Sequence, residues 1–215
     1  MGGARLSWSR GARRATALGA GAAVAALGAA VWWRRNPSAC PYSQRFWIEA
    51  PHPVVTRQRV LEALAPRVGE RLLEVGPGTG YYSLAVAERL GPDGRLDLLD
   101  VQQEMLDHTM GRAAAAGVGN VFGVRADARE MPFPDDSFDG AWLCVVLGEV
   151  PDQDAALAEL ARVVRPGGRV VVGEVMLDPH YVRYGDLIER ARRVGLELEH
   201  RLGGRLGYVA RLRAI

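Results

Sequence analysis

The sequence predicts an α/β fold in which helices cover both faces of a doubly wound, mostly parallel sheet. From residue 71 onward, short apolar runs alternate with stretches of helical spacing, and that alternation is typical of parallel sheets. The segments LELEHRL (196–202) and GYVARLR (207–213) instead alternate with period two and are joined by Gly203-Gly204. They predict an antiparallel hairpin that follows the parallel strands.

The predicted strands are the short apolar runs. RLLEV (71–75) ends at glycines, and RVVVGEV (169–175) is nearly continuous in its apolar residues, as expected of buried strands. Pro166-Gly167-Gly168 is predicted to form a turn into the second of these. The other three predicted strands are RLDLLD (95–100), NVFGVRAD (120–127) and FDGAWLCVV (138–146).

The predicted helices separate these strands. Thr56 is a suitable N-cap for the first helix, and Gly117 is a suitable stop for the third. In the fourth helix, Leu157, Leu160 and Val164 recur at helical spacing. The five helices are expected at residues 57–64, 81–90, 102–116, 152–164 and 186–194.

The first 35 residues differ in composition from the rest of the chain. Residues 15–33 carry no charge and are flanked by arginines. A helix of that length spans about 28 Å, close to the hydrocarbon thickness of a bilayer. We therefore expect a basic leader and a hydrophobic, membrane-spanning helix in residues 1–35, a connector in residues 36–55, and one domain in residues 56–215. A mitochondrial transit peptide and a cleaved secretory signal are the alternatives for the leader.

The charge balance argues against nucleic acid as a partner. Six of the 27 basic residues, all of them arginine, lie in residues 1–40, so that 21 basic side chains face 25 acidic ones in residues 41–215. A mildly acidic body lacks the basic field of a nucleic-acid-binding protein. Cys40 and Cys144 are far apart and fit neither a metal-site spacing nor a disulfide framework, so no metal site is expected.

The first predicted strand runs directly into a glycine-rich loop, Glu74-Val75-Gly76-Pro77-Gly78-Thr79-Gly80. Glycines let a backbone turn tightly and approach a ligand closely, and the helix that follows presents free N–H groups. A dinucleotide site has the spacing G-x-G-x-x-G, whereas Tyr81 stands here at the position of the third glycine. Glu74 is suited to a ligand ammonium, contacted directly or through water, and would repel a pyrophosphate.

Two more carboxylates follow predicted strands. Asp100 ends the second strand, where a carboxylate can accept from both hydroxyls of a ribose. Asp127 ends the third predicted strand, and its side chain is placed to accept from the amine of an adenine. The carboxyl ends of parallel strands meet at one edge of a sheet. An ammonium, a carboxylate, a ribose and an adenine would thus all find partners at that edge.

At these positions the sequence resembles the class I S-adenosylmethionine-dependent methyltransferases, and in particular the subgroup that includes the ubiquinone and menaquinone methyltransferases. The resemblance covers roughly residues 56–213. The segments that carry it are LLEVGPGTG (72–80), LDLLDVQQEML (96–106), ADAREMPFPDDSFDGAW (126–142), LGEVPD (147–152) and RVVRPGGRVVVGE (162–174).

The resemblance implies a Rossmann-like, seven-stranded sheet whose last strand is antiparallel, with S-adenosyl-L-methionine as the cofactor. It also implies that residues 56–215 form a methyltransferase domain. The residues expected to surround the cofactor are Glu74, Gly76, Gly78, Gly80, Asp100, Val101, Gln102, Asp127, Ala128 and Leu143.

The expected activity is methyl transfer to a small molecule. Members of the subgroup often carry histidine before a V-P-D triplet, and Glu149 stands there in this chain. We therefore take Glu149 as the candidate base for an acidic acceptor. The alternatives are an NAD-type oxidoreductase, which Glu74 and the glycine spacing disfavour, and a non-catalytic protein that binds S-adenosylmethionine.

A membrane helix in residues 15–33 would make a lipophilic, membrane-borne acceptor plausible. The arginines around this run favour an N-terminus inside the cell and a body outside it. A cofactor made in the cytoplasm requires the opposite orientation. We expect the cofactor requirement to decide, with the catalytic domain on the cytoplasmic side, or else a mitochondrial or a soluble protein once the leader has been removed.

Overall fold

The computed structural model describes residues 28, 36–46 and 53–215. The chain divides into two units, Met1–Pro37 and Ser38–Ile215, and the second contains the sheet. Apart from Gly28, the predicted helix over residues 15–33 lies outside the described residues, as does the part of the connector from 47 to 52. Among the helices that the structure describes, none combines the length and the apolar character needed to cross a membrane.

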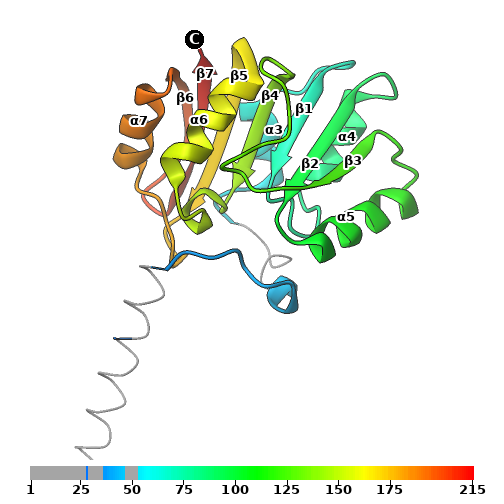
Figure 1. Ribbon diagram of the computed structural model, residues 1–215, viewed down its shortest axis with the longest axis horizontal. Helices are drawn as coiled ribbons and strands as arrows, with labels where there is room; N and C mark the ends of the chain where they lie inside the picture. The colour runs from blue at the N-terminus through cyan, green and yellow to red at the C-terminus, as the bar shows by residue number, and fades with distance from the viewer. Residues whose placement is uncertain (1–27, 29–35, 47–52) are drawn as a thin grey trace, which may run out of the picture. The chain divides into compact units, whose positions relative to one another are not determined.

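The described residues form a seven-stranded sheet with the order β3-β2-β1-β4-β5-β7-β6 (Figure 1). Neighbouring strands among β1 to β5 pair in parallel, and β7 is antiparallel to both β5 and β6. The predicted doubly wound sheet with an antiparallel last strand is therefore confirmed. The strands are β1 (Arg71–Val75), β2 (Arg95–Asp100), β3 (Val121–Arg125), β4 (Phe138–Cys144), β5 (Val164–Val175), β6 (Leu196–Gly204) and β7 (Gly207–Ala214).

The helices begin and end close to their predicted bounds. Thr56 caps the first of them by accepting a hydrogen bond from the backbone N–H of Arg59 at 3.2 Å, and Asp152 caps α6 by accepting from the N–H of Ala155 at 3.0 Å. The described α-helices are α3 (Arg57–Leu64), α4 (Ser83–Leu90), α5 (Gln103–Ala115), α6 (Gln153–Val163) and α7 (Tyr184–Arg193). A 3₁₀ turn, η1 (Tyr42–Gln44), precedes them, and a second, η2 (Leu147–Glu149), follows β4.

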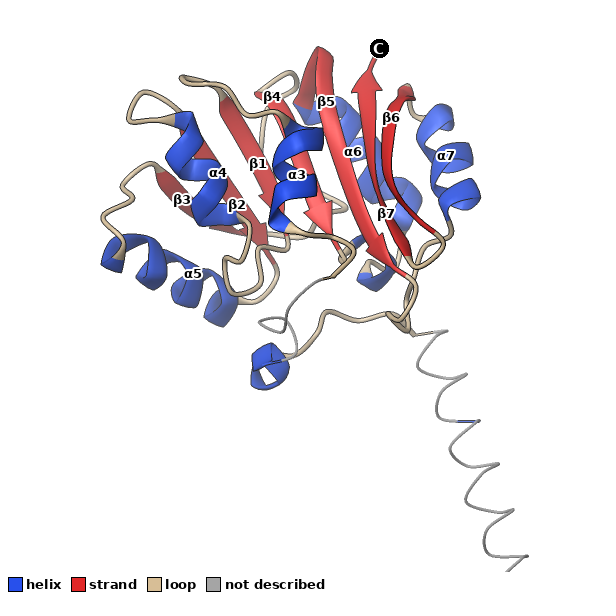
Figure 2. Ribbon diagram, turned by 180° about the vertical axis from the view of Figure 1, so that it is seen from behind, coloured by secondary structure: helices blue, strands red, loops and turns tan. Residues whose placement is uncertain are grey.

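The helices form a layer on each face of the sheet. Figure 2 shows α3 and α4 in front of the sheet, and Figure 1, from the other side, shows α6 and α7. Successive side chains of β4 pack against the two helix layers alternately. Trp142 packs in the cluster under α3 and α4, whereas Leu143 packs in the cluster under α6 and α7. This alternation buries both faces of the central strands, which explains their continuous apolar runs.

Two predicted strand ends are shorter in the structure. β3 ends at Arg125, so that Asp127 lies beyond the strand, in a turn bridged to Glu130. β4 ends at Cys144 because Val145 has a φ of +59°, a conformation that a β-branched residue rarely adopts. Helix α4 begins at Ser83, two residues after its predicted start.

Two glycine segments differ from their predicted roles. Pro166-Gly167-Gly168 lies inside β5, where Phe138 pairs with Val164 and Gly140 pairs with Arg169, so the segment forms a bulge within the strand and does not precede it. Gly203 and Gly204 are the last residues of β6, and the hairpin turn is Arg205-Leu206. The pattern of apolar and polar residues predicted where the strands lie. It could not predict how many residues the bulge in β5 contains.

Candidate functional site

The glycine-rich loop lies at the point where the order of the strands reverses, between β1 and β4. Gly76, Gly78 and Gly80 have φ values of +67°, +55° and +79°. A Cβ atom on Gly76 would lie only 2.5 Å from Cγ2 of Val146, which follows β4. The loops after β1 and β4 thus touch here, at the edge where doubly wound sheets bind their ligands.

Glu74 lies directly before this loop and is only 2 % exposed. One of its carboxyl oxygens accepts from Nε1 of Trp142 at 3.1 Å, and the other accepts a short hydrogen bond from the Ser83 hydroxyl. Burial raises the pKa of Glu74 to about 8. Both oxygens therefore already have protein partners, and the carboxyl group ties β1 to β4 and to α4. No ligand contact is needed to explain its position.

Asp100 stands beside the glycine-rich loop, because the N–H of Gly76 donates to the carbonyl of Leu99 at 2.8 Å. Its carboxylate is 8 % exposed and accepts from the backbone N–H of Gln102 at 2.9 Å. Burial raises the pKa of Asp100 to about 6. The predicted juxtaposition of a glycine loop and a carboxylate, at the tips of adjacent strands, is present in the structure.

A nucleoside cofactor fits this part of the site. Thr79 is fully buried inside the glycine loop, and its hydroxyl oxygen has no hydrogen-bond partner among the residues that the structure describes. Thr109 of α5 steadies the loop by donating to the carbonyl of Gly78 at 2.9 Å. The loop backbone thus approaches the site closely, an unsatisfied hydroxyl lies within it, and Asp100 supplies a carboxylate next to it.

The other predicted cofactor residues are placed differently. Asp127 is held by Arg129, whose backbone N–H donates to it at 2.9 Å and whose guanidinium pairs with it at 2.7 Å. That pairing lowers the pKa of Asp127. The side chains of Ala128 and Leu143 are buried in the core under α6 and α7. Val101 is 44 % exposed at the tip of β2.

A segment that we call the strap, residues 38–46, lies across the carboxyl edge of the sheet (Figure 1). Gln102 binds it with both atoms of its side-chain amide. Nε2 donates to the carbonyl of Cys40 at 2.9 Å, and Oε1 accepts from the N–H of Tyr42 at 3.1 Å. The hydroxyl of Tyr42 also lies 3.2 Å from Nδ1 of His108. Gln102, predicted to contact the cofactor, is thus engaged with the strap.

Glu149 lies on the other side of the strap, in η2. Its Oε2 accepts from the N–H of Cys40 at 3.1 Å. Burial raises its pKa to about 7, with smaller contributions in the same direction from the carboxylates of Asp178 and Asp100 and an opposing one from the Cys40 hydrogen bond. Gly148 fixes the position of this turn, since a Cβ atom there would lie 1.8 Å from the carbonyl oxygen of His180. The candidate base thus titrates near neutral pH at the same edge as the glycine loop.

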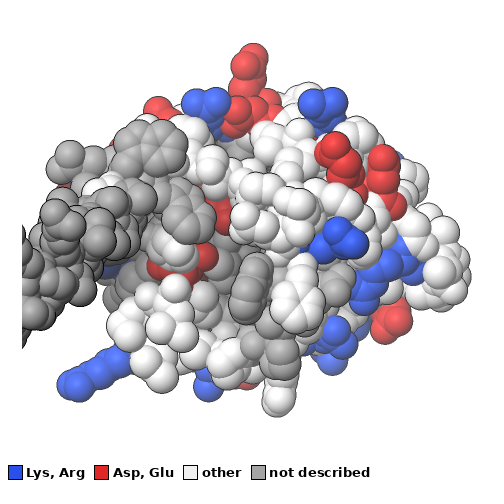
Figure 3. All heavy atoms as spheres, turned by 90° about the horizontal axis from the view of Figure 1, so that it is seen from below, with Lys and Arg blue, Asp and Glu red and all other residues white. Residues whose placement is uncertain are grey.

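Figure 3 views this edge directly. Uncharged atoms surround a hollow in which acidic side chains are visible. Another buried carboxylate belongs to the region: Glu174 of β5 is 1 % exposed, and the Val182 N–H donates to one of its oxygens at 3.3 Å. Burial raises its pKa, as do Asp178 and Glu149. Among the described residues, no cluster of metal-binding side chains is present.

Sequence reasoning did not identify the partners that support the site. Ser83 and Trp142, which hold Glu74, read as ordinary helix and strand residues, and Cys40 lies in what was expected to be a plain connector. The proline-rich connector that carries Cys40 and Tyr42 was expected only to link the leader to the domain, and no periodicity in it indicates which edge of the sheet it meets.

Comparisons with known proteins agree with this geometry. Residues 72–168 match the family model described as a methyltransferase domain. The chain is 39 % identical over 117 residues, 54 % of its length, to a demethylmenaquinone methyltransferase of Staphylococcus aureus strain JH9. That alignment covers 48 % of the relative, so the chain spans about half the length of the curated relatives it matches.

Solved structures show the same fold. The chain is similar to a SAM-dependent methyltransferase from Aquifex aeolicus, with a TM-score of 0.75 and 19 % identity, over 82 % of this chain and all of that one. It is also similar to a Haemonchus contortus phosphoethanolamine N-methyltransferase crystallised with S-adenosylhomocysteine, with a TM-score of 0.59 and 21 % identity, over 68 % and 38 % of the two chains. The fold is that of the class I S-adenosylmethionine-dependent methyltransferases.

Proposed function

We propose that this protein is an S-adenosylmethionine-dependent methyltransferase that acts on a small, lipophilic acceptor. One observation carries the proposal. Three glycines with positive φ and the carboxylate of Asp100 stand side by side at the carboxyl ends of β1 and β2, at the point where the strand order reverses. The methyltransferase-domain match over residues 72–168 supports the same activity.

The roles of the chain's own residues follow from their positions. The backbone of the Gly76–Gly80 loop and the hydroxyl of Thr79 would hold the polar end of the cofactor, and Asp100 would accept from its ribose. When bound, the cofactor supplies a methyl group that its sulfonium has already activated. The protein therefore contributes mainly by aligning the acceptor with that methyl group at a near-attack distance.

Glu149 is the proposed base. A phenol or enol acceptor must lose its hydroxyl proton as its carbon or oxygen attacks the methyl group. A base with a pKa near the working pH takes up that proton best. The pKa of Glu149 is about 7. The N–H of Cys40, which donates to Oε2, stabilises the carboxylate form and orients it.

The acceptor class rests on the relative's name. The similar Staphylococcus aureus protein is a demethylmenaquinone methyltransferase, and we propose an acceptor of that lipophilic, quinone-like type. A membrane helix in residues 15–33 would bring the domain to such an acceptor. We propose that the domain lies on the cytoplasmic side, where the cofactor is made; protection of the body from protease in sealed inside-out vesicles would contradict that orientation.

Calorimetry separates the proposed function from its alternatives. The full chain is titrated with S-adenosylhomocysteine and, separately, with NADH. We expect binding of the first and none of the second, and we expect Asp100→Asn to weaken the first by about tenfold, as loss of a charge-assisted hydrogen bond does. Binding of NADH alone would establish the oxidoreductase alternative. Binding of S-adenosylhomocysteine without methyl transfer to any acceptor would establish the non-catalytic one.

A further inference from the structure

Three large apolar side chains stand exposed together near the end of β5. Met176 is 46 % exposed, Leu177 is 90 % exposed and Leu206 is 61 % exposed. They belong to two segments that are bonded to each other, since the N–H of Met176 donates to the carbonyl of Leu206 at 3.0 Å. We call Met176, Leu177 and Leu206 the apolar rim. Large apolar side chains exposed on two neighbouring segments favour an interaction surface.

The apolar rim lies at the same edge of the sheet as the candidate site. Leu206 is in the turn that follows β6, and Met176 and Leu177 follow β5. Both strands are antiparallel to β7, so their carboxyl ends lie at one edge. That edge is the one at which Glu149 and the strap meet. The strap contributes another exposed apolar side chain, Phe46, which is 71 % exposed.

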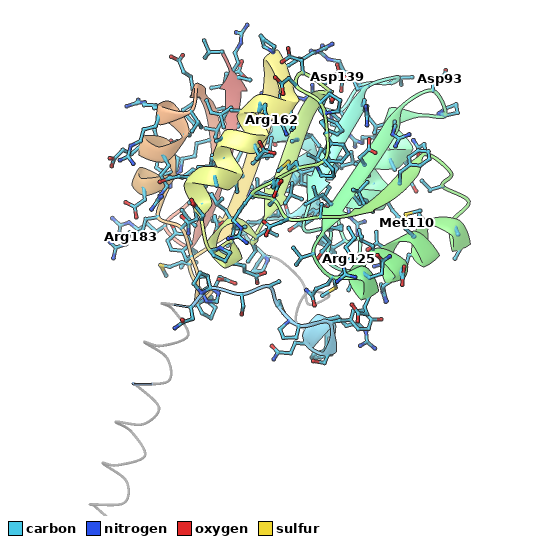
Figure 4. All side chains as sticks on the ribbon, in the orientation of Figure 1. Asp93, Met110, Arg125, Asp139, Arg162 and Arg183 are labelled. Carbon is cyan, nitrogen blue, oxygen red and sulfur yellow. The ribbon has the colours of Figure 1, made fainter. Side chains whose placement is uncertain are left out.

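Arginines flank the apolar rim. Arg205 is exposed in the same turn as Leu206, and Arg183 is exposed immediately before α7. Figure 4 labels Arg183 and Arg125 toward this edge, with Asp93 and Asp139 toward the opposite one. Two acids lie near the rim in the chain: Asp178, which follows Leu177 and is half-buried, and Asp186, which is exposed in the first turn of α7. Exposed apolar side chains combined with arginines suit a surface of anionic phospholipid, which offers hydrocarbon below a layer of negative charge.

The place at which the chain enters the domain also favours a lipid surface as the partner. The strap enters the domain at this edge, and only residues 34–37 separate Ser38 from the uncharged run that ends at Trp33. Five residue steps extend at most about 18 Å. If the run lies in a bilayer, Ser38 and the edge to which the strap is bonded must therefore lie close to the surface of that bilayer.

We propose that the domain docks on an anionic lipid surface through the apolar rim, so that the site faces the bilayer from which a lipophilic acceptor enters. This proposal rests on the proposed function for the nature of the acceptor. The docking itself is independent of methyl transfer, because it requires only that Met176, Leu177 and Leu206 lose contact with water.

Hydrogen exchange of the full chain tests the docking. Exchange is measured with and without vesicles of equal parts phosphatidylglycerol and phosphatidylcholine, in peptides that cover residues 175–178 and 203–207. We expect vesicles to slow exchange in both peptides several-fold, and less so when the vesicles contain phosphatidylcholine alone. Unchanged exchange in the presence of bound vesicles would overturn the proposal and leave a protein partner as the occupant of the rim.

Matched variants make the test specific. The double variant Leu177→Glu and Leu206→Glu places charge on the rim, and we expect it to lose the protection. Val68→Glu is the control, because Val68 is 74 % exposed but lies between α3 and β1, at the opposite edge. Protection that survives in the double variant would contradict the proposal. Calorimetry with S-adenosylhomocysteine on the same variants reports separately on the proposed function and on folding.

Discussion

At the scale of single residues, the pKa of Glu149 predicts how the rate of methyl transfer depends on pH. A base must be deprotonated to act, and half of the Glu149 carboxyl groups are protonated when the pH equals their pKa of about 7. We therefore expect the rate of methyl transfer to rise about tenfold per pH unit below 7 and to level off above it. A pH–rate profile under cofactor and acceptor saturation measures this directly.

Variants identify the group that titrates. Glu149→Gln should lower the rate by a factor of 10² to 10⁴, as removal of a general base commonly does, and should abolish the acidic limb of the profile. Glu189→Gln is the control, since Glu189 is exposed on α7, where it pairs with Arg193. A Glu149→Gln enzyme with full turnover and an unchanged profile would rule out the role as base.

Glu74 makes a second prediction, on stability. Its pKa is about 8 in the folded protein and near 4.5 in the unfolded chain, so the folded state binds the proton more tightly. Between these values the free energy of unfolding should fall as the pH rises, by up to about 4 kcal/mol. Glu74→Gln cannot ionise, so chemical denaturation at pH 5 and pH 8 should find a smaller loss of stability than in the wild type, with the remainder due to Asp100, Glu149 and Glu174. A variant that loses stability as the wild type does would refute this assignment.

The partner of the Asp127 carboxylate could not be predicted from its position in the sequence. Its position at the end of a predicted strand suggested a contact with adenine. In the structure its carboxylate instead pairs with Arg129, two residues away. A local turn with its own cation satisfies an acid as well as a ligand does. Sequence spacing located Asp100 correctly because a strand end fixes it, whereas it could not choose between two partners for an acid in a loop.

At the scale of elements, the close packing of the glycine loop predicts that adding a single methyl group to it weakens binding of the cofactor. Alanine at position 76 would require a φ of +67° and would place Cβ 2.5 Å from Val146. The backbone strain alone amounts to about 1–2 kcal/mol. We expect Gly76→Ala to weaken binding of S-adenosylhomocysteine by about tenfold or more, measured by calorimetry.

Gly111 provides the matched control for this prediction. It lies within α5, and a Cβ atom there meets nothing within 4 Å. Gly111→Ala should raise the free energy of unfolding by about 1 kcal/mol, because alanine has the higher helix propensity, and should leave binding unchanged. Equal binding by both alanine variants would mean that the loop does not approach a ligand.

The strap is the element that the sequence left undefined, and it makes its own prediction. Gln102→Ala removes both hydrogen bonds from the side-chain amide to Cys40 and Tyr42. We expect hydrogen exchange in residues 38–46 to accelerate several-fold. Gln103→Ala is the control, because Gln103 is exposed and its amide binds Asp107 of the same helix. Equal exchange in the two variants would show that Gln102 does not hold the strap.

Strands and helices were largely predictable because burial imposes a pattern on them. β1, β2 and α3 have the bounds that their apolar runs and their cap predict. The bulge of β5 and the backbone of Val145 were not predictable, since each depends on contacts with a neighbouring strand. The same is true of the strap, whose position is set by hydrogen bonds from Gln102 and Glu149 on two distant elements.

At the scale of the whole molecule, topology assembles the site. The crossover that places β4 beside β1 brings Val146 and Glu149 to the glycine loop, which lies about 70 residues earlier in the chain. The resemblance of the sequence to a known family implied this topology, and the antiparallel hairpin supported it from the residues alone. The acceptor is less defined, because the surfaces that would select it include the strap and the apolar rim, which no motif marks.

The central claim is that this chain transfers a methyl group from S-adenosylmethionine to a lipophilic molecule. The most direct measurement incubates the full chain with cofactor labelled in its methyl group and with membrane lipids, and then counts the label extracted into organic solvent. We predict label in that extract with the wild type and at least tenfold less with Glu149→Gln. Cofactor that binds while the extract stays unlabelled, over a range of lipid sources and soluble acceptors, would contradict the account.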